Sequence, residues 1–218
     1  SYPVRLFRAT LEAKGYLHFY ASEYLKITHV SDVLHNWALM LAVNDVRSDP
    51  EQSHLQNLRG INFYCTPGAP MAVARRTYKR NPVPEDTGAG KMGLMEIEYY
   101  LPGSTFQFYT LSRDGSPPPS MFHYGKKRVP CQLSPDPRSS GWEGSTLPFR
   151  AHDTVDVRRV SHLVNPLDYD AITNVSYAKK VPMKPSPLYY LAANFARVLL
   201  ADRMKVVVPN LEASIEWS

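Results

Sequence analysis

The sequence has little of the chemistry from which metal and redox centres are built. Its 218 residues include two cysteines, Cys65 and Cys131, and neither has a second thiol two or three positions away. Zinc ribbons and redox pairs need that spacing. The seven histidines also show no metal-ligand spacing on one helix, which argues against a zinc site. We therefore expect no metal, no cofactor and reduced cysteines, with a single disulfide as the open alternative.

Long apolar runs and a secretory signal are missing as well. No apolar segment approaches the length of a membrane span, and the N-terminus does not join a basic stretch to an apolar one. We expect a soluble cytoplasmic protein with no membrane partner. Glycine is scarce, at 11 residues against 19 prolines, which favours stiff connections over flexible linkers.

The positive charge is concentrated in two segments. The chain has 25 basic and 20 acidic residues. Pro70–Gly93 holds five basic and two acidic residues, and Met121–Leu133 holds three basic residues and no acid, which leaves 17 basic and 18 acidic residues elsewhere. A basic surface on a nearly neutral body attracts polyanions, so nucleic acid is the leading candidate partner and an anionic membrane the second.

The apolar pattern predicts an α+β fold. Residues 3–13 alternate like a half-buried strand, and strands are also expected at 61–67, 71–80, 94–102, 104–112 and 149–164. Ser31 or Asp32 is the expected N-cap of an amphipathic helix, whose apolar face would contain Val33, Leu34, Trp37, Ala38, Leu41 and Ala42. A short helix is expected from Pro50 to Leu58, closed by Gly60, and residues 186–202 fit either a helix or two strands before a closing strand at 204–209.

This order of elements indicates a ferredoxin-type (RRM-like) sandwich with a long hairpin extended from its edge. Many RNA-binding domains share the fold, although a fold alone does not give a function. We expect residues 1–133 to form the ferredoxin-like domain, with the hairpin at about 70–101. Residues 134–218 would be a β-rich C-terminal extension that completes the same domain.

The hairpin strand RRTYKR is the first candidate RNA site. Alternate side chains of a strand share a face, which puts Arg75, Thr77 and Lys79 on one side and Arg76, Tyr78 and Arg80 on the other. Cations on both sides indicate that neither side is core, and Tyr78 has the type of ring that stacks on a base. The alternative is a solvated edge hairpin whose charges discourage aggregation.

The second candidate is the nonapeptide FHYGKKRVP, Phe122 to Pro130. Gly125 permits positive φ or close approach to a phosphate, and Lys126, Lys127 and Arg128 supply the charge. Tyr124 and Phe122 are either stacking surfaces or core anchors, and a plain surface turn is the alternative for the whole segment. His35, on the expected helix, is a further candidate for RNA contact, against the simpler interpretation of a partly buried histidine with a backbone partner.

A metal-independent ribonuclease is the alternative function. It would need a base such as His35 or His123 and a lysine such as Lys126 to stabilise the charge on the phosphorane. The residue types are present, but nothing in the sequence brings them together.

The chain resembles a known family in three segments that occur in the same order: VLHNWALMLAVN, FYCTPGAPM and FHYGKKRVPCQL. The resemblance is to the 5′-handle-binding subunit of type I-D CRISPR interference complexes, the type I-D member of the Cas-five family within the RAMP superfamily. It runs from about Tyr2 to Leu133.

The resemblance implies a modified ferredoxin-like domain with a thumb hairpin at the foot of a Cascade particle. Such subunits hold the 5′ handle of the CRISPR RNA, cap the filament of backbone subunits, and contact the large subunit beside the PAM duplex of the target DNA. By position, the thumb corresponds to about Met71–Leu101, including Arg75, Arg76, Lys79, Arg80 and Lys91, and the glycine-containing loop to Tyr124–Arg128. The resemblance also implies no catalytic residue, because type I-D systems are expected to use a separate processing nuclease.

Overall fold

The structure is a computed structural model. It describes residues 4–24, 27–30, 33–47, 49, 51–52, 60–80, 95–125, 127–136 and 141–142, and the pairs 155–156, 162–163 and 172–173. The predicted helix at 50–58 lies largely outside these residues, as do Ser31, Asp32, and the predicted elements at 186–202 and 204–209.

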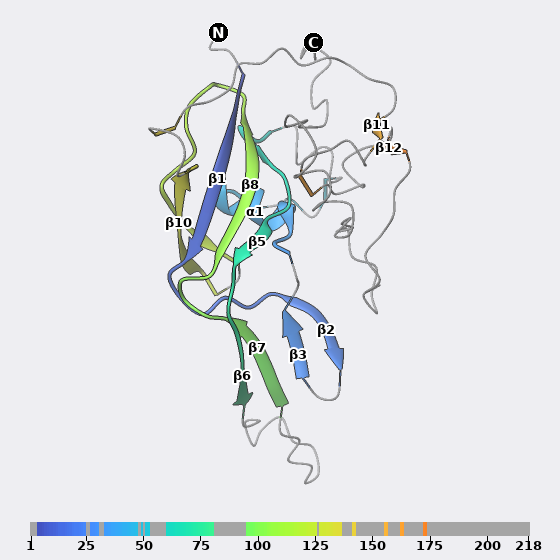
Figure 1. Ribbon diagram of the computed structural model, residues 1–218. Helices are drawn as coiled ribbons and strands as arrows, with labels where there is room; N and C mark the ends of the chain where they lie inside the picture. The colour runs from blue at the N-terminus through green and yellow to red at the C-terminus, as the bar shows by residue number, and fades with distance from the viewer. Residues whose placement is uncertain are drawn as a thin grey trace.

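A six-stranded antiparallel sheet forms the body of the molecule (Figure 1). Its order is β4-β8-β1-β10-β9, with β5 also pairing β8. The strands are β1 (Arg5–Ala13), β4 (Phe63–Cys65), β5 (Ala69–Ala72), β8 (Thr105–Ser112), β9 (Met121–Tyr124) and β10 (Val129–Pro135). The predicted strands at 3–13, 61–67 and 104–112 are confirmed.

A second, four-stranded sheet lies below the first in Figure 1, in the order β2-β3-β7-β6. It contains β2 (Tyr20–Tyr24), β3 (Ile27–Val30), β6 (Arg75–Arg80) and β7 (Met95–Tyr100). β6 and β7 form the predicted antiparallel hairpin, and β7 also pairs in parallel with β3. The hairpin is therefore not a free arm, since β3 supports one of its edges.

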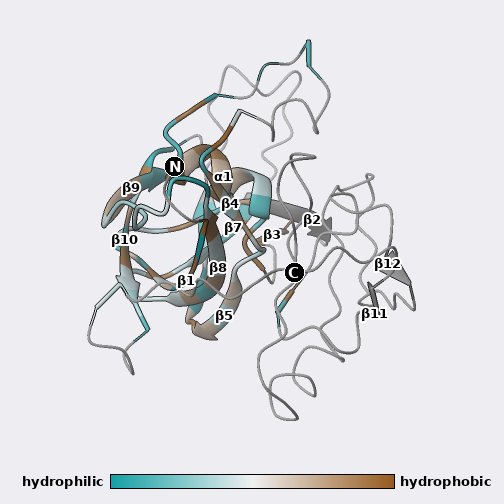
Figure 2. Ribbon diagram, turned by 90° about the horizontal axis from the view of Figure 1, so that it is seen from above, coloured by the Kyte–Doolittle hydropathy of each residue, from teal (hydrophilic) through white to brown (hydrophobic). Residues whose placement is uncertain are grey.

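The core lies on the face of the main sheet that α1 covers. Leu11 on β1 is in register with Phe106 on β8 and Leu133 on β10, and all three side chains are buried. Burying an aliphatic or aromatic side chain contributes about 1.5–3 kcal/mol, so this row stabilises the three central strands. From above, the sheet is seen to curl, with α1 against one of its faces (Figure 2).

The helix α1 (Asn36–Val43) begins later than predicted. His35 is the N-cap, because its Nδ1 accepts the Trp37 N–H at 3.1 Å. Leu34 is extended and pairs with Gly68. Val33 and Leu34 therefore precede the helix, and the helical face that was counted from Val33 does not match the face that is buried. The buried residues of the helix are Asn36, Leu39, Met40 and Val43 instead of the predicted set.

The strand order is compatible with the predicted ferredoxin-like class. The chain runs through β1, α1, β4 and β8 before β10 pairs on the other side of β1. A second helix would be expected before β10, but residues 113–125 and 127–128 form β9 and turns without one. The described part is thus mostly antiparallel sheet with a single α-helix, an α+β arrangement that does not single out the ferredoxin-like class.

The described residues that directly follow Leu133, and Trp142, pack on the main sheet. β10 continues to Pro135, Arg8 pairs with Asp136 at 3.0 Å, and the Phe7 and Trp142 rings lie 5.9 Å apart. Further on, the structure describes the two-residue strands β11 (Val155–Asp156) and β12 (Ile172–Thr173) and the buried pair 162–163. The proposed division at residue 133 stays a prediction.

Both cysteines are free and buried, so the expectation of reduced thiols holds and the disulfide alternative does not. Burial raises the pKa of Cys65 to about 12, and it does the same for Cys131. A protonated, buried thiol is a poor nucleophile and a poor metal ligand.

Candidate nucleic-acid interface

The β6–β7 hairpin presents two different faces. Arg76 is opposite Tyr99 and Tyr78 is opposite Ile97, while Arg75 is opposite Tyr100. Because cross-strand partners point to the same side of a sheet, Arg76, Tyr78 and Tyr99 share one face. Arg75 lies on the other, as the alternation in the sequence predicted.

Three tyrosines form a cluster on the Arg76 face, called here the tyrosine cluster: Tyr16, Tyr78 and Tyr99. Ring centroids lie 5.6 Å apart for Tyr16 and Tyr78, 6.3 Å for Tyr16 and Tyr99, and 5.8 Å for Tyr78 and Tyr99. The interplanar angles are 88°, 84° and 71°, which are edge-to-face contacts of the kind aromatic rings prefer.

Tyr16 also changes the acidity of the Tyr78 hydroxyl. The pKa of Tyr78 is raised, first because its hydroxyl hydrogen bonds with the Tyr16 side chain, then through partial desolvation and the proximity of Tyr16. Arg76 acts in the opposite direction without reversing the shift. Tyr78 therefore stays neutral at physiological pH and adds no negative charge that would repel an anionic ligand.

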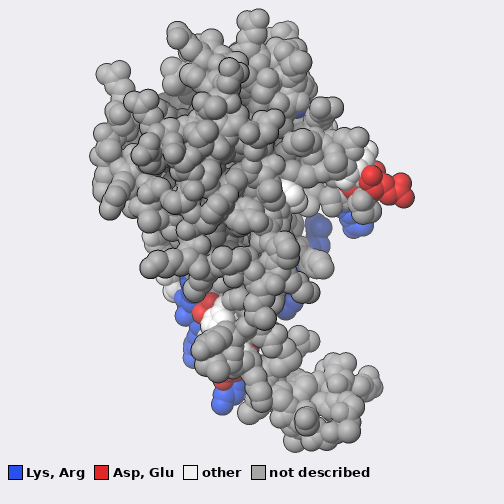
Figure 3. All heavy atoms as spheres, turned by 90° about the vertical axis from the view of Figure 1, so that its right-hand side faces the viewer, with Lys and Arg blue, Asp and Glu red and all other residues white. Residues whose placement is uncertain are grey.

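Two cations lie over the cluster. The Arg76 guanidinium is 5.5 Å from the Tyr78 ring centroid, and the Lys127 ammonium is 5.7 Å from that of Tyr99. Both are cation–π distances. Among the described residues, neither cation has a carboxylate within ion-pair distance. Figure 3 shows basic side chains along the lower part of the molecule, where the hairpin lies.

Lys127 comes from the tight turn between β9 and β10. Tyr124 and Val129 pair across the hairpin, and the Arg128 N–H donates to the Gly125 carbonyl at 3.1 Å. Gly125 has φ +74° and Arg128 has φ +50°. A Cβ at Gly125 would meet nothing within 4 Å, so the glycine is needed for its backbone conformation, and the space above it is open. The β9–β10 turn and the β6–β7 hairpin, distant in sequence, thus meet where Lys127 lies over Tyr99.

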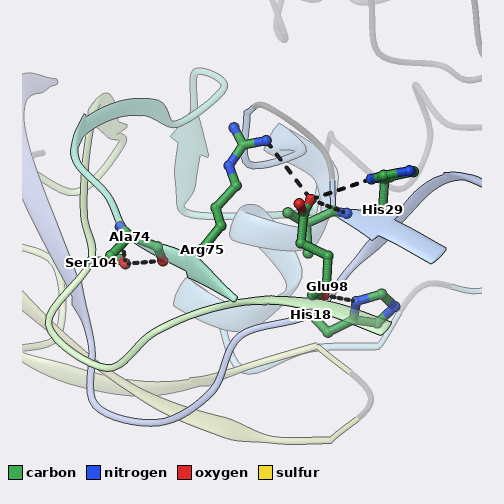
Figure 4. Close-up of polar contacts among 7 residues, drawn as sticks. His18, His29, Ala74, Arg75, Glu98 and Ser104 are labelled. Atoms are coloured by element: carbon green, nitrogen blue, oxygen red, sulfur yellow. Dashed lines mark hydrogen bonds and ion pairs between the residues drawn. The ribbon is translucent and has the colours of Figure 1, made fainter. Parts of the chain in front are cut away.

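The opposite face of the hairpin is organised around Glu98 (Figure 4). Its Oε1 accepts the Val30 N–H at 3.2 Å and lies 3.8 Å from His29 Nδ1 and 3.9 Å from an Arg75 guanidinium nitrogen. The Arg75 guanidinium also lies 5.0 Å from the Tyr100 ring centroid. Arg75 is therefore partly neutralised and points away from the tyrosine cluster.

One comparison with known proteins decides the family. The family model of the type I-D CRISPR-associated protein Cas5/Csc1 matches residues 4–212. The chain belongs to this family. The match also extends well beyond Leu133, where the likeness recognised in the sequence ended. No curated protein matches the chain.

Membership identifies the chain as a type I-D CRISPR subunit and implies that it works within a Cascade complex. Subunits of this family are generally non-catalytic components of the effector. No helix among the described residues is long and apolar enough to cross a membrane.

Tyr124 requires a correction. Its ring is 2% exposed and packs at 5.9 Å from Phe19 in the core, and burial raises its pKa. Phe122 is buried too. Because both residues point inward from β9, they are core anchors, and Tyr124 offers no surface on which a base can stack.

His35 is partly buried, and its Nδ1 is occupied by the helix cap. Its contact with RNA stays a prediction. Lys79 and Arg128 are exposed, on β6 and in the turn. The backbone of Arg80 belongs to β6, but its side chain lies outside the described residues, as do Lys91 and Lys126.

The two histidines considered for catalysis do not converge. Tyr124 points inward and lies against the backbone of His35. Its neighbour His123 is exposed on the other face of β9, since successive strand residues point to opposite sides. Within the described chain, no group of three or more His, Cys, Asp or Glu side chains is placed to hold a metal ion.

Sequence reasoning missed Tyr16 and Tyr99. Pairing RRTYKR with LMEIEYYLP in the correct register would have placed Tyr99 beside Tyr78. Tyr16 lies in the connection after β1, in a stretch with no periodic pattern. No local signal connects it to the hairpin.

Proposed function

We propose that this chain is a non-catalytic subunit that binds the 5′ handle of the CRISPR RNA. In the same role it would cap the filament of backbone subunits and contact the large subunit beside the PAM duplex of the target DNA. The observation that supports this most is the position of Lys127, which brings the basic turn onto the basic hairpin.

Single-stranded RNA is bound by cations that contact phosphates and aromatic rings that contact bases. Arg76 and Lys127 lie over the rings of one tyrosine cluster and have no acidic partner among the described residues. The acidic partner of the hairpin, Glu98, is on the opposite face, against Arg75. This asymmetry favours one ligand-binding face.

The salt dependence of RNA binding tests the role of the cations. Each lost phosphate contact to a single strand reduces the slope of log Kobs against log salt by about 0.7. The double substitution Arg76→Ala and Lys127→Ala is therefore expected to weaken binding of the 5′ handle RNA and to reduce the slope by about 1.4. Binding is measured by filter retention or anisotropy from low to moderate salt.

A matched control is Arg47→Ala, which removes an exposed cation that lies after α1, outside the hairpin and the turn. It should leave affinity and slope close to those of the unmodified chain. An unchanged slope in the double variant, or an equal loss in the Arg47 variant, would show that general charge and not this site binds the RNA.

Copurification tests the assembly role. A co-expressed backbone subunit, large subunit and guide RNA should elute with this chain as one particle. The ribonuclease alternative is tested by incubating the purified chain with repeat RNA in EDTA. Specific cleavage that His35→Ala or His123→Ala abolishes would overturn the non-catalytic assignment.

A further inference from the structure

We propose that the exposed ring of Tyr16 is a stacking platform for one unpaired nucleobase, with Arg76 and Lys127 contacting the phosphates that flank it. The inference rests on the proposed RNA binding and adds to it a residue outside both basic segments. It assigns the base contact to the tyrosine cluster and leaves the charge contacts to the hairpin and the turn.

Tyr16 is exposed although its neighbour is fixed in the core. Its side chain is 52% exposed, whereas Leu17 is buried. Leu17 exchanges two backbone hydrogen bonds with Tyr100, at 3.0 and 2.8 Å. The backbone beside Tyr16 is therefore tied to β7, and the ring projects from a rigid support.

The ring itself is held in one orientation. Tyr16 stands nearly perpendicular to both Tyr78 and Tyr99 and contacts both rings edge to face. A side chain that is already ordered loses little conformational entropy when a ligand binds. An exposed, preorganised ring is the arrangement that base stacking needs.

The three rings of the cluster differ in what covers them. Arg76 lies over Tyr78 and Lys127 lies over Tyr99. No described cation lies over Tyr16. A base that stacks on Tyr16 would have two cations close by, one over each of the two rings that Tyr16 contacts, and these cations are available to the phosphates on either side of that base. Because these two cations have no carboxylate partner among the described residues, they disfavour an apolar protein segment as the occupant.

Two substitutions at Tyr16 distinguish stacking on an aromatic ring from contact with apolar volume alone. Tyr16→Phe keeps the ring, and Tyr16→Leu keeps a similar apolar volume without it. Loss of one stacked base weakens single-strand binding by roughly 5- to 150-fold. We expect a loss of that size for Tyr16→Leu, near-normal binding for Tyr16→Phe, and an unchanged salt slope for both, because no phosphate contact is removed.

Abasic scanning of the 5′ handle RNA provides a readout that does not depend on the folding of a variant. On the unmodified chain, one abasic position should weaken binding by a similar factor. The same abasic RNA should bind Tyr16→Leu no more weakly than the complete RNA does. Absence of any sensitive position on the unmodified chain would refute the platform.

The outcomes distinguish this inference from the proposed function. If the Arg76 and Lys127 double variant loses salt slope while Tyr16→Leu binds like the unmodified chain, the RNA site stands and the platform is wrong. If the double variant changes nothing, the RNA site itself is wrong. A loss for Tyr16→Phe as large as that for Tyr16→Leu would assign the effect to the hydroxyl and contradict stacking.

Discussion

Replacement of Gly68 by alanine should destabilise the chain measurably. Gly68 and Leu34 exchange two backbone hydrogen bonds at 2.9 Å, which join the start of α1 to the strand that leads into the hairpin. A Cβ at Gly68 would lie 2.8 Å from the Leu34 Cβ and 3.1 Å from both Cγ and Cδ1. Leu34 is fully buried, so it has no room to move away.

Overpacking of this kind costs about 1–3 kcal/mol. For a chain of this size, each kcal/mol lowers the melting temperature by about 2–4 °C. We therefore expect Gly68→Ala to lower the melting temperature by about 2–12 °C, as measured by circular dichroism, with a matching shift of the urea midpoint.

Gly15→Ala is the matched control. Its Cβ would lie 3.3 Å from Val129 Cγ1 and 3.8 Å from Pro130 Cδ, which is a milder approach than the one at Gly68. A glycine-to-alanine change also gains about 0.4–1 kcal/mol through the unfolded state, which offsets part of the cost, so this variant should melt closer to the temperature of the unmodified chain than Gly68→Ala does. A Gly68→Ala variant that melts as high as the control would refute the close packing of Leu34 on Gly68.

Three further predictions concern turns and caps. Asn44 accepts the backbone N–H groups of Asn62 and Phe63 at 3.1 and 2.9 Å. Asn44 Nδ2 also donates to the Met40 and Phe63 carbonyls, both at 2.8 Å. Asn44→Ala should therefore cost about 2 kcal/mol in urea unfolding, and Asn44→Asp, whose carboxylate would face those two carbonyls, at least as much. Because Gly125 has φ +74°, Gly125→Ala should cost about 1 kcal/mol by the same assay, and Gly125→Asn should cost less. Serine and asparagine donors hold the pKa of Asp114 well below its usual range. Its ionised form thus stabilises the fold at pH values above the unfolded-state pKa of about 3.9. The unmodified chain should therefore melt at a higher temperature than Asp114→Asn at pH 7, and this difference in melting temperature should shrink as the pH falls below about 4.

The strands at 3–13, 61–67 and 104–112 were predictable because their pattern is local, whereas β2, β3, β9 and β10 lie in segments for which no strand was predicted. In β1, Ala9, Leu11 and Ala13 alternate with half-buried polar residues, and this period is visible in the sequence. The β6–β7 hairpin was predictable for the same reason. The helix boundary was not, because a histidine cap is uncommon and a pairing with the distant Gly68 keeps Leu34 extended.

The site was predictable only in part. The basic residues stand in short runs that composition reveals, so Arg76 and Lys127 were found. Their convergence depends on how two hairpins are placed by separate sheets, which no local pattern encodes. Tyr124 was ambiguous because an aromatic residue beside a turn fits either face of a strand. Its burial follows from its position on β9, on the side that packs against α1.

Glu98 explains why the hairpin has one open face. Its carboxylate joins Val30 on β3 to Arg75 on β6, while its backbone carbonyl lies 2.8 Å from His18 Nδ1. The carboxylate contacts fix the hairpin against β3 from the side opposite the tyrosine cluster, whereas the His18 ring lies 5.4 Å from the Tyr99 ring of the cluster. The Arg75 and Glu98 side chains are 33% and 17% exposed and 3.9 Å apart, so the ion pair itself contributes little energy. Its effect is to place the negative charge on the supporting side, which leaves Arg76 and Lys127 as the charges that an approaching polyanion meets.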